Sequence, residues 1–351
     1  MNRLRVGIAG FGVVGNRRRE VIDQNPYFQT VAACDQKFIQ NMPKSKDLKF
    51  FTNYKDLLKV PLDVLFVCLP NYLAAEVTIA GLERGVHVFC EKPPGRMVED
   101  IERVIEAEKK HPQLKLKYGF NHRYHDSVQE ALRIVHSGEL GEIINMRGVY
   151  GKSKIIPFSG GWRAERRYSG GGILLDQGIH MVDLMRLFCG EFEEVKSFVS
   201  NSYWNHDVED NAYAIMRDRK GRIAMLHSTA TQWQHQFSLE IALTQGSLCL
   251  KGILSGSKSY GQEQLIKARR SEADTGIEGE EVVNYLNDDS WRREVNEFAD
   301  AVINNVPVPS GTSRDALLTM QLVYKIYFAD EGWREQFQIQ DPVRIPAGQD
   351  R

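Results

Sequence analysis

The sequence predicts an α/β protein in which a doubly wound parallel sheet is followed by an α+β domain with a large, mostly antiparallel, open sheet. Up to residue 121, short apolar runs alternate with amphipathic helical patterns, which is typical of parallel sheets. Beyond residue 121, strand patterns joined by short turns predominate, which is typical of antiparallel sheets. The length of 351 residues, with 42% hydrophobic and 26% charged residues, suits two globular domains.

The first element is an apolar strand, LRVGIA, that runs into the glycine-rich stretch GIAGFGVVG at residues 7–15. Gly10, Gly12 and Gly15 have G-x-G-x-x-G spacing, and a helical pattern and a second strand follow. In that context the glycines predict a Rossmann-type dinucleotide loop: a tight turn at the first, backbone approach to the pyrophosphate at the second, and close helix packing at the third. The N-terminus of the following helix would offer N–H groups to the phosphates. The alternative is a purely structural glycine turn.

The second strand, QTVAACD, ends on Asp35, twenty residues beyond Gly15. A carboxylate there would accept hydrogen bonds from both ribose hydroxyls and repel a 2′-phosphate. The sequence therefore predicts NAD rather than NADP as cofactor, although Lys37 would offset part of the repulsion.

Three more strands are expected at 62–70, 86–93 and 114–120, separated by helices at 74–85 and 98–110. Ligands of such sheets bind at the carboxyl ends of the strands, so the residues that follow each strand should meet at one crevice. The cofactor-binding residues predicted in this way are Gly10, Phe11, Gly12, Val13, Val14, Gly15, Asp35, Leu69, Pro70, Asn71, Glu91, Lys92 and Asn121.

The second half is expected to hold about six strands, near 142–151, 194–202, 211–218, 222–231, 237–244 and 247–252. One helix, LLDQGIHMVDLMRLF, interrupts them, and the polar stretch 271–290 is predicted to be a loop. Thr312 and Asp315 are expected to cap a last helix that ends near residue 330. We thus expect domains at 1–121 and 122–351, with the C-terminal helices packing back on the first domain.

These segments together resemble the glucose-fructose oxidoreductase / inositol dehydrogenase / rhizopine catabolism (Gfo/Idh/MocA) family. The matching motifs are the glycine loop, CLPN at 68–71, EKP at 91–93, GFNHRY at 119–124 and GGGILLDQGIHMVDL at 170–184. The resemblance implies hydride transfer between NAD or NADP and a ring carbon of a sugar or cyclitol, and it implies no metal.

Three residues are candidates for catalysis: Lys92, Asp176 and His180. Oxidation of a carbinol carbon needs a base near the hydroxyl, and Lys92 closes the fourth strand at the crevice. Asp176 and His180 are four residues apart, so on a regular helix they share one face, turned away from the apolar stripe. Either Lys92 or His180 would take the proton. The alternatives are a surface lysine paired with Glu91 and a surface helix pair.

The substrate pocket is predicted to include Lys92, Asp176 and His180 together with Tyr124, Trp162 and Arg163. Trp162 would stack on a sugar ring and Arg163 would bind a carboxylate or phosphate, unless both serve only packing and surface charge.

The function predicted from these residues is that of an NAD(P)-dependent dehydrogenase acting on CH–OH groups of a sugar, nucleotide sugar or cyclitol. Two alternatives are a non-catalytic dinucleotide-sensing regulator and an NAD-dependent glycosidase. Retention of both Lys92 and His180 argues against the regulator, and only the dehydrogenase would release net NADH. The sequence does not name the substrate, the oxidised carbon or the direction of the reaction.

The remaining features concern location and partners. The net charge of −1 offers no basis for binding nucleic acid or an anionic membrane. The N-terminus is broken by glycine too early for a secretory signal peptide, and no apolar run approaches the roughly 20 residues of a membrane span. Five widely spaced cysteines favour buried free thiols and a cytoplasmic location. They are Cys34, Cys68, Cys90, Cys189 and Cys249.

Apolar side chains fall on both sides of the strand patterns NAYAIM and RIAMLHSTAT. An exposed sheet face of that kind is unusual for a monomer, so we expect a homodimer or homotetramer formed through the second domain. The alternative is a monomer whose 252–290 segment covers the face.

Overall fold

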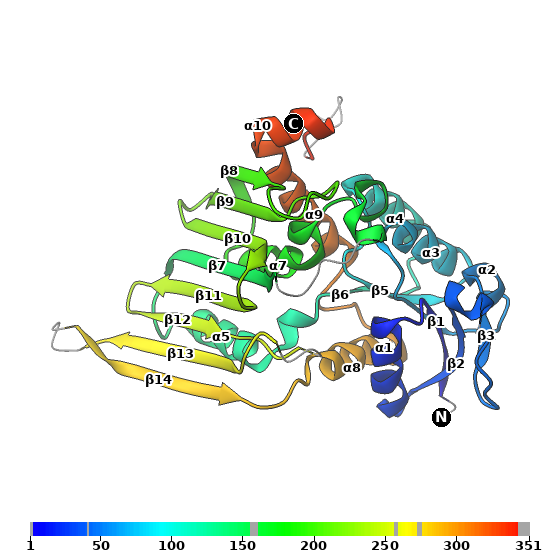
Figure 1. Ribbon diagram of the computed structural model, residues 1–351. Coiled ribbons are helices and arrows are strands. Elements are labelled where there is room, and N and C mark those ends of the chain that lie inside the picture. The colour runs from blue at the N-terminus through cyan, green and yellow to red at the C-terminus, as the bar shows by residue number, and fades with distance from the viewer. Residues whose placement is uncertain (1–2, 41, 155–160, 256–258, 272–275, 343–351) are drawn as a thin grey trace. The chain divides into compact units, whose positions relative to one another are not determined.

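The computed structural model describes residues 3–40, 42–154, 161–255, 259–271 and 276–342 (Figure 1). The chain forms two compact units, each assembled from separate stretches. Unit 1 comprises Met1–Asn121, Arg167–Gly170 and Asp289–Leu317, and unit 2 comprises His122–Arg166, Gly171–Asp288 and Leu318–Arg351.

Unit 1 is built on six parallel strands in the order β3-β2-β1-β4-β5-β6. The strands are β1 (Leu4–Ala9), β2 (Phe28–Cys34), β3 (Lys49–Phe51), β4 (Val64–Val67), β5 (His87–Glu91) and β6 (Leu116–Gly119). The helices are α1 (Val13–Gln24), α2 (Tyr54–Leu57), α3 (Asn71–Glu83), α4 (Val98–Lys110) and α8 (Ser290–Ile303), with a 3₁₀ turn at Gln36–Ile39. The order runs outward from β1 in both directions, so the predicted doubly wound sheet is confirmed.

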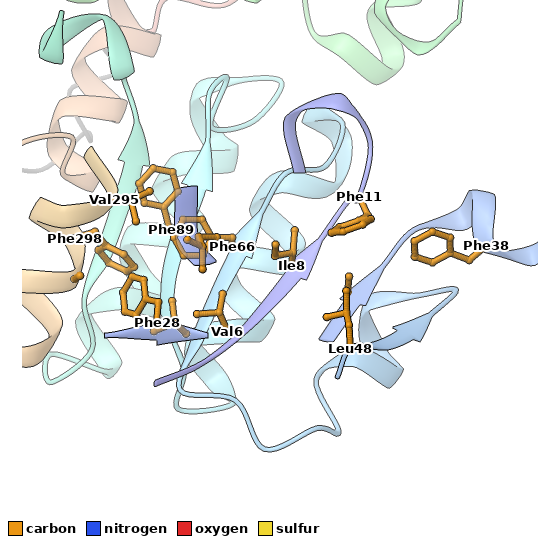
Figure 2. Packing of buried hydrophobic residues seen from close by; sticks show 14 residues of the cluster. Val6, Ile8, Phe11, Phe28, Phe38, Leu48, Phe66, Phe89, Val295 and Phe298 are labelled. Atoms are coloured by element: carbon orange, nitrogen blue, oxygen red, sulfur yellow. The ribbon is translucent and has the colours of Figure 1, made fainter. Parts of the chain in front are cut away.

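Helix α8 completes the hydrophobic core of unit 1 (Figure 2). Its Phe298 ring lies 6.4 Å from Phe28, 6.1 Å from Phe66 and 5.6 Å from Phe89, measured between ring centroids. These three phenylalanines come from β2, β4 and β5, and all four are fully buried. The apolar stripe that the sequence shows in this helix therefore packs on the parallel sheet.

Unit 2 is built on eight strands in the order β14-β13-β12-β11-β7-β10-β9-β8, seen as a ladder in Figure 1. Only β7 and β10 pair in parallel, so the predicted mostly antiparallel sheet is confirmed. The strands are β7 (Ile143–Ser153), β8 (Phe192–Ser200), β9 (Asn211–Asp218), β10 (Ile223–Gln232), β11 (Gln236–Leu243), β12 (Gly246–Lys251), β13 (Glu263–Arg270) and β14 (Ile277–Tyr285).

Two strands more are present than the six expected, because β13 was not recognised and β14 falls in the stretch 271–290 that was predicted to be a loop. That loop prediction is wrong. Strand β14 is an edge strand, and residues 279–284 are all exposed, so no alternation of buried and exposed side chains marks it in the sequence. The described part of 252–290 extends the sheet sideways and does not form a cover over its face.

The helix predicted at 174–188 is in two parts, a π-helical turn (Leu174–Gly178) followed by α7 (Ile179–Cys189). The buried carboxylate of Glu209 accepts hydrogen bonds from the N–H groups of Gly172 (2.7 Å) and Leu174 (3.0 Å) and from the hydroxyl of Tyr327 (2.6 Å). Glu209 and Tyr327 are distant in sequence from residues 172–174, and their contacts fix the start of the π-helical turn. The expectation of one regular helix with an outward polar face is therefore wrong, and every described residue of α7 except Leu187 is buried.

The remaining helical elements belong to unit 2 or to both units. Unit 2 also contains α5 (Asp126–Ser137), α10 (Glu331–Phe337) and a 3₁₀ turn at Trp162–Ala164, and α9 (Ser313–Ala329) and α6 (Arg166–Ser169) span the boundary between units, as does the 3₁₀ turn Asn121–Tyr124. The predicted cap of α9 is confirmed, since the N–H of Thr312 donates to the Asp315 carboxylate and the N–H of Asp315 donates to the Thr312 hydroxyl. The helix is followed by α10, so it is not the last one.

One exposed face of the second sheet carries large apolar side chains beside charged ones such as Arg147 and Glu240. In β9, Ala212, Ala214 and Met216 are buried, whereas Tyr213 and Ile215 are about half exposed. Met225, Ile144 and Phe198 on other strands are also exposed, Phe198 by 80%. A hollow of about 770 Å³ on unit 2 is lined by residues of β7, β10, β11 and β12, among them Ile144 and Met225.

All five cysteines are free thiols, and Cys34, Cys90 and Cys189 are buried. Among the described helices, none combines the length and hydropathy that spanning a bilayer requires.

Two glycines of the first loop allow a matched test of the fold. A Cβ on Gly15 would lie 2.0 Å from the carbonyl oxygen of Gly10, whereas a Cβ on Gly12 would meet no heavy atom within 4 Å. We expect Gly15→Ala to cost about 1–3 kcal/mol of unfolding free energy, the usual effect of overpacking, and Gly12→Ala to change it by less than about 0.5 kcal/mol. Urea unfolding of both variants measures this, and equal losses would contradict the packing described.

Candidate active site

The glycine loop between β1 and α1 packs against two strand ends. Gly10 has φ +90°, its N–H donates to the Cys34 carbonyl (2.9 Å), and a Cβ there would lie 2.2 Å from the Cys68 carbonyl oxygen, so only glycine fits. Gly12 precedes the first residue of α1, and no side chain caps that helix. Open space over Gly12 and uncapped N–H groups at a helix N-terminus are features that suit a phosphate group.

Asp35 lies beside this loop at the end of β2. One carboxylate oxygen accepts the N–H of Phe11 (2.8 Å) and the other accepts the N–H of Lys37 (3.0 Å), which caps a 3₁₀ turn. The Lys37 ammonium donates to the Phe11 carbonyl. Because each carboxylate oxygen can accept two hydrogen bonds, Asp35 keeps acceptor capacity for a ribose hydroxyl. The sequence analysis did not predict that Asp35 also accepts backbone hydrogen bonds that stabilise the loop and the 3₁₀ turn.

Two predicted cofactor ligands, Asn71 and Asn121, hold parts of unit 1 together. The Asn71 amide donates to the Ser169 carbonyl (2.7 Å), and the Asn121 amide donates to the Ser290 hydroxyl (3.2 Å). Both asparagines are buried. Asn71 is the first residue of α3 and follows Pro70 at the end of the β4 connection.

Lys92 follows β5 directly and is half-buried in unit 1. The residue before it, Glu91, accepts a hydrogen bond of 2.5 Å from Nε of Arg18. Arg18 is fully buried and donates through its other arm to Glu294 (2.6 Å). Burial raises the pKa of Glu294 to about 7, against the opposing effect of Arg18. Glu91 is thus tied into the core, and Lys92 stands at the end of a strand fixed by that contact.

In unit 2, His180 of α7 stacks on His122. The two imidazole rings are 3.7 Å apart between centroids and inclined by 13°, and both residues are buried. Nε2 of His122 is 3.2 Å from the Tyr150 hydroxyl. The hydrogen bond with Tyr150 orients the His122 ring, and stacking on that ring orients His180. The sequence had predicted that His180 lies on the outer face of a helix. That prediction is wrong, because His180 is buried and faces His122.

Asp176 lies in the π-helical turn, with a side chain that is 23% exposed. Its carboxylate is 3.6 Å from Nε of Arg163, whose guanidinium stacks on the Trp162 ring at 4.2 Å. The Tyr260 hydroxyl donates to the neighbouring Gln177 (2.9 Å). This region of unit 2 is accessible and bears both charge and aromatic surface, as a sugar-binding site does.

Aromatic rings surround Tyr150 on several sides. Phe237 lies 5.4 Å and Tyr260 5.2 Å from it, and His235 lies 4.7 Å from Tyr260. Burial raises the pKa of both tyrosines, so their hydroxyls remain protonated near neutral pH.

Sequence reasoning missed His122, Tyr150, Lys152 and Tyr260. A signal was present in the strand segment GVYGKS, where Tyr150 and Lys152 fall at positions that alternate with the outward ones. Of the remaining predictions, Tyr124 is buried and Trp162 is half-buried. Among the described residues, no group of three or more histidine, cysteine or acidic side chains is arranged to hold a metal ion.

Comparison with known proteins places these features in a family. Residues 4–120 match the family model described as "Oxidoreductase family, NAD-binding Rossmann fold", and residues 128–249 match the "GFO/IDH/MocA C-terminal domain".

The chain is 30% identical to a D-glucoside 3-dehydrogenase of Escherichia coli (strain K12) over 64% of its length and 70% of the relative's. It is 29% identical to a 1,5-anhydro-D-fructose reductase of Ensifer adhaerens over 59% of its length and 62% of that protein's. Among solved structures, a levoglucosan dehydrogenase in complex with NADH and L-sorbose shares the fold, with a TM-score of 0.83, 20% identity and coverage of 94% of this chain and 97% of that one.

The two matches follow each other along the chain, the first over the parallel sheet and the second over much of the mostly antiparallel sheet. The chain therefore belongs to the GFO/IDH/MocA family of oxidoreductases, with an NAD-binding Rossmann domain in its N-terminal part.

Proposed function

We propose that the protein is an NAD-dependent dehydrogenase that oxidises a ring CH–OH of a sugar, nucleotide sugar or cyclitol, or reduces the corresponding ketone. The observation that carries the proposal is Lys92 at the end of β5, in the same unit as a glycine loop that suits a dinucleotide. When bound, the nicotinamide supplies the hydride acceptor or donor. The chain must then move the hydroxyl proton and hold the ring carbon in place.

The roles proposed for the chain's own residues follow from their surroundings. The pyrophosphate would lie on the N-terminus of α1 over Gly12, and the ribose on Asp35. Lys92 would exchange the hydroxyl proton through Nζ, because Glu91 and the core behind it fix the strand end that carries it. His180, oriented by its stack on His122, and Asp176 would bind the hydroxyls beside the reacting carbon.

We also propose a cytoplasmic location, since all five cysteines are free thiols and such proteins occur in reducing compartments.

The test of the function is a screen of sugars, nucleotide sugars and cyclitols for NADH formation at 340 nm, with the parent protein and the Lys92→Met variant. Loss of a general acid–base group should lower kcat by about 10²–10⁴-fold. Binding of NADH, followed by its fluorescence, should be retained in the variant. His180→Ala should also be strongly impaired. Turnover near the parent's rate in Lys92→Met would exclude Lys92 as the proton-transfer residue, and hydrolysed sugar without net NADH would identify a glycosidase.

The preference for NAD over NADP is tested at Asp35. We expect a lower dissociation constant for NADH than for NADPH, because the carboxylate repels a 2′-phosphate. Asp35→Ser keeps an oxygen that can cap the 3₁₀ turn but removes the charge, so it should narrow the preference without unfolding the loop. Titration with both reduced cofactors measures this, and tighter binding of NADPH by the parent protein would refute the assignment.

We further propose that the protein is a homodimer or homotetramer formed through the exposed face of the unit 2 sheet that carries large apolar side chains, because an exposed face of that kind is unusual for a monomer. Ile215→Glu should dissociate the assembly, while Ile39→Glu, a matched change at an exposed isoleucine of unit 1, should not. Light scattering after size exclusion measures the mass of the parent protein and of both variants. A mass near 40.1 kDa for the parent at micromolar concentration would rule the assembly out.

A further inference from the structure

Gln177 follows Asp176 in the π-helical turn and carries a side-chain amide that is held in one orientation. Its carbonyl oxygen, Oε1, accepts a hydrogen bond of 2.9 Å from the hydroxyl of Tyr260. Burial raises the pKa of Tyr260, so the hydroxyl keeps its proton near neutral pH and is the donor of this bond. Because the amide group is planar, a fixed Oε1 also fixes the direction of the two N–H bonds on Nε2.

The residue that orients Gln177 belongs to the aromatic cluster beside the candidate catalytic residue His180. Tyr260 is buried, and its ring lies 5.2 Å from that of Tyr150, measured between centroids. The Tyr150 ring lies in turn 6.5 Å from the imidazole of His180. Burial and, to a smaller extent, the charge of Asp176 raise the pKa of both tyrosines, as a nearby carboxylate does. Gln177 is thus fixed from within the candidate substrate site of unit 2.

The nitrogen of the Gln177 amide keeps contact with solvent. The residue is half-buried, and within the described part of the chain Nε2 has no hydrogen-bond partner. Nε2 is not one of the buried polar atoms that lack a partner, so water reaches it. The side chain therefore offers an oriented N–H donor one residue away from the Asp176 carboxylate, which is an acceptor.

We propose that Gln177 is a specificity-determining residue that donates a hydrogen bond from Nε2 to a hydroxyl oxygen of the substrate, at a position that does not react. This inference rests on the proposed function and assigns a substrate contact at the same site. An ionised carboxylate only accepts hydrogen bonds, whereas the N–H groups of an amide only donate them. A substrate with a hydroxyl at the position bound by Gln177 provides the acceptor, and a deoxy analogue leaves the amide without one.

The experiment combines a change in the protein with a change in the substrate. A panel of pyranosides and cyclitols, each with its monodeoxy derivatives, is assayed for NADH formation with the parent protein and with Gln177→Leu, which has no N–H. For one hydroxyl position, its removal from the substrate should lower kcat/KM of the parent about tenfold, the usual worth of one hydrogen bond. In Gln177→Leu the same removal should change kcat/KM by less than about threefold, because the donor is already lost.

The division of the loss between KM and kcat separates a substrate contact from a structural role. The loss in Gln177→Leu should appear in KM, because a contact with a hydroxyl that does not react is equally strong in the ground and transition states. Tyr260→Phe removes the hydroxyl that orients the amide and should weaken the same discrimination in part, again through KM. A fall in kcat on every compound, deoxy derivatives included, would show that Gln177 only supports Asp176 and His180, and would overturn the inference.

Gln264→Leu is the matched control. Gln264 is another half-buried glutamine of unit 2, on β13, and its amide nitrogen donates to Asn284 on the edge strand β14 at 2.7 Å. The change thus removes the same chemical group together with a hydrogen bond on the outer strands of the sheet. Discrimination between the hydroxyl compound and its deoxy derivative should survive it. An equal loss in both glutamine variants would contradict the proposal, since it would reflect a general weakening of unit 2.

Calorimetry with the Lys92→Met variant and NADH measures binding of the same panel without turnover. In that background Gln177→Leu should raise the dissociation constant of the hydroxyl compound about tenfold and leave that of its deoxy derivative within about threefold. If this difference is found and the parent protein forms no NADH, the proposed dehydrogenase activity fails and the contact of Gln177 stands. If Gln177→Leu selectively weakens the binding or turnover of no compound in the panel, the inference fails whatever the activity.

Discussion

The ion pairs of the buried Arg18 guanidinium are the interaction on which the candidate active site of unit 1 depends. The guanidinium lies between the rings of Phe89 and Trp291, at 4.5 and 4.0 Å, and donates to Glu91 and Glu294. Arg18 belongs to α1, which begins at the glycine loop, Glu91 ends β5, and Glu294 belongs to α8. One side chain therefore joins the cofactor loop, the strand that carries Lys92 and the helix that completes the core. Because removal of one partner from such a group leaves an uncompensated buried charge, which typically costs about 3–5 kcal/mol, the three elements cannot vary independently.

The same contact makes the stability of the folded protein depend on pH. One guanidinium serves two carboxylates, and Glu294, whose side chain is fully buried, holds its proton up to a pH of about 7 compared with an ordinary value of 4.5. The folded state thus binds this proton more firmly than the unfolded chain does. The corresponding stabilisation is complete below the ordinary pKa and is lost as pH rises through about 7.

The elements that could be predicted from the sequence are those in which burial or a tight turn restricts the type of neighbouring residues. Apolar runs such as VLFV and the spacing from the glycines to Asp35 identified the parallel sheet and its loop, because burial on both faces and a tight turn each restrict residue type directly. Strand β14 was missed because an edge strand exposed on both faces has no such restriction. The π-helical turn was missed because Glu209, more than thirty residues away, holds its start. His122 and Tyr150 were missed for a related reason, since their pairing with His180 arises only when the turn, β7 and α7 come together.

Charged side chains of unit 2 differ in their access to solvent, and that difference separates structural groups from candidate site residues. Glu209 accepts two backbone N–H groups and a tyrosine hydroxyl, and its side chain has no access to solvent, so it builds the fold. Asp176 and Arg163 are separated by 3.6 Å and retain 23% and 49% exposure. A polar group costs free energy when it is taken from water without compensation, and a charge that keeps contact with water avoids much of that cost and stays accessible to a ligand. Asp176 and Arg163, which keep contact with solvent, are therefore candidates for binding a substrate, whereas Glu209 is not.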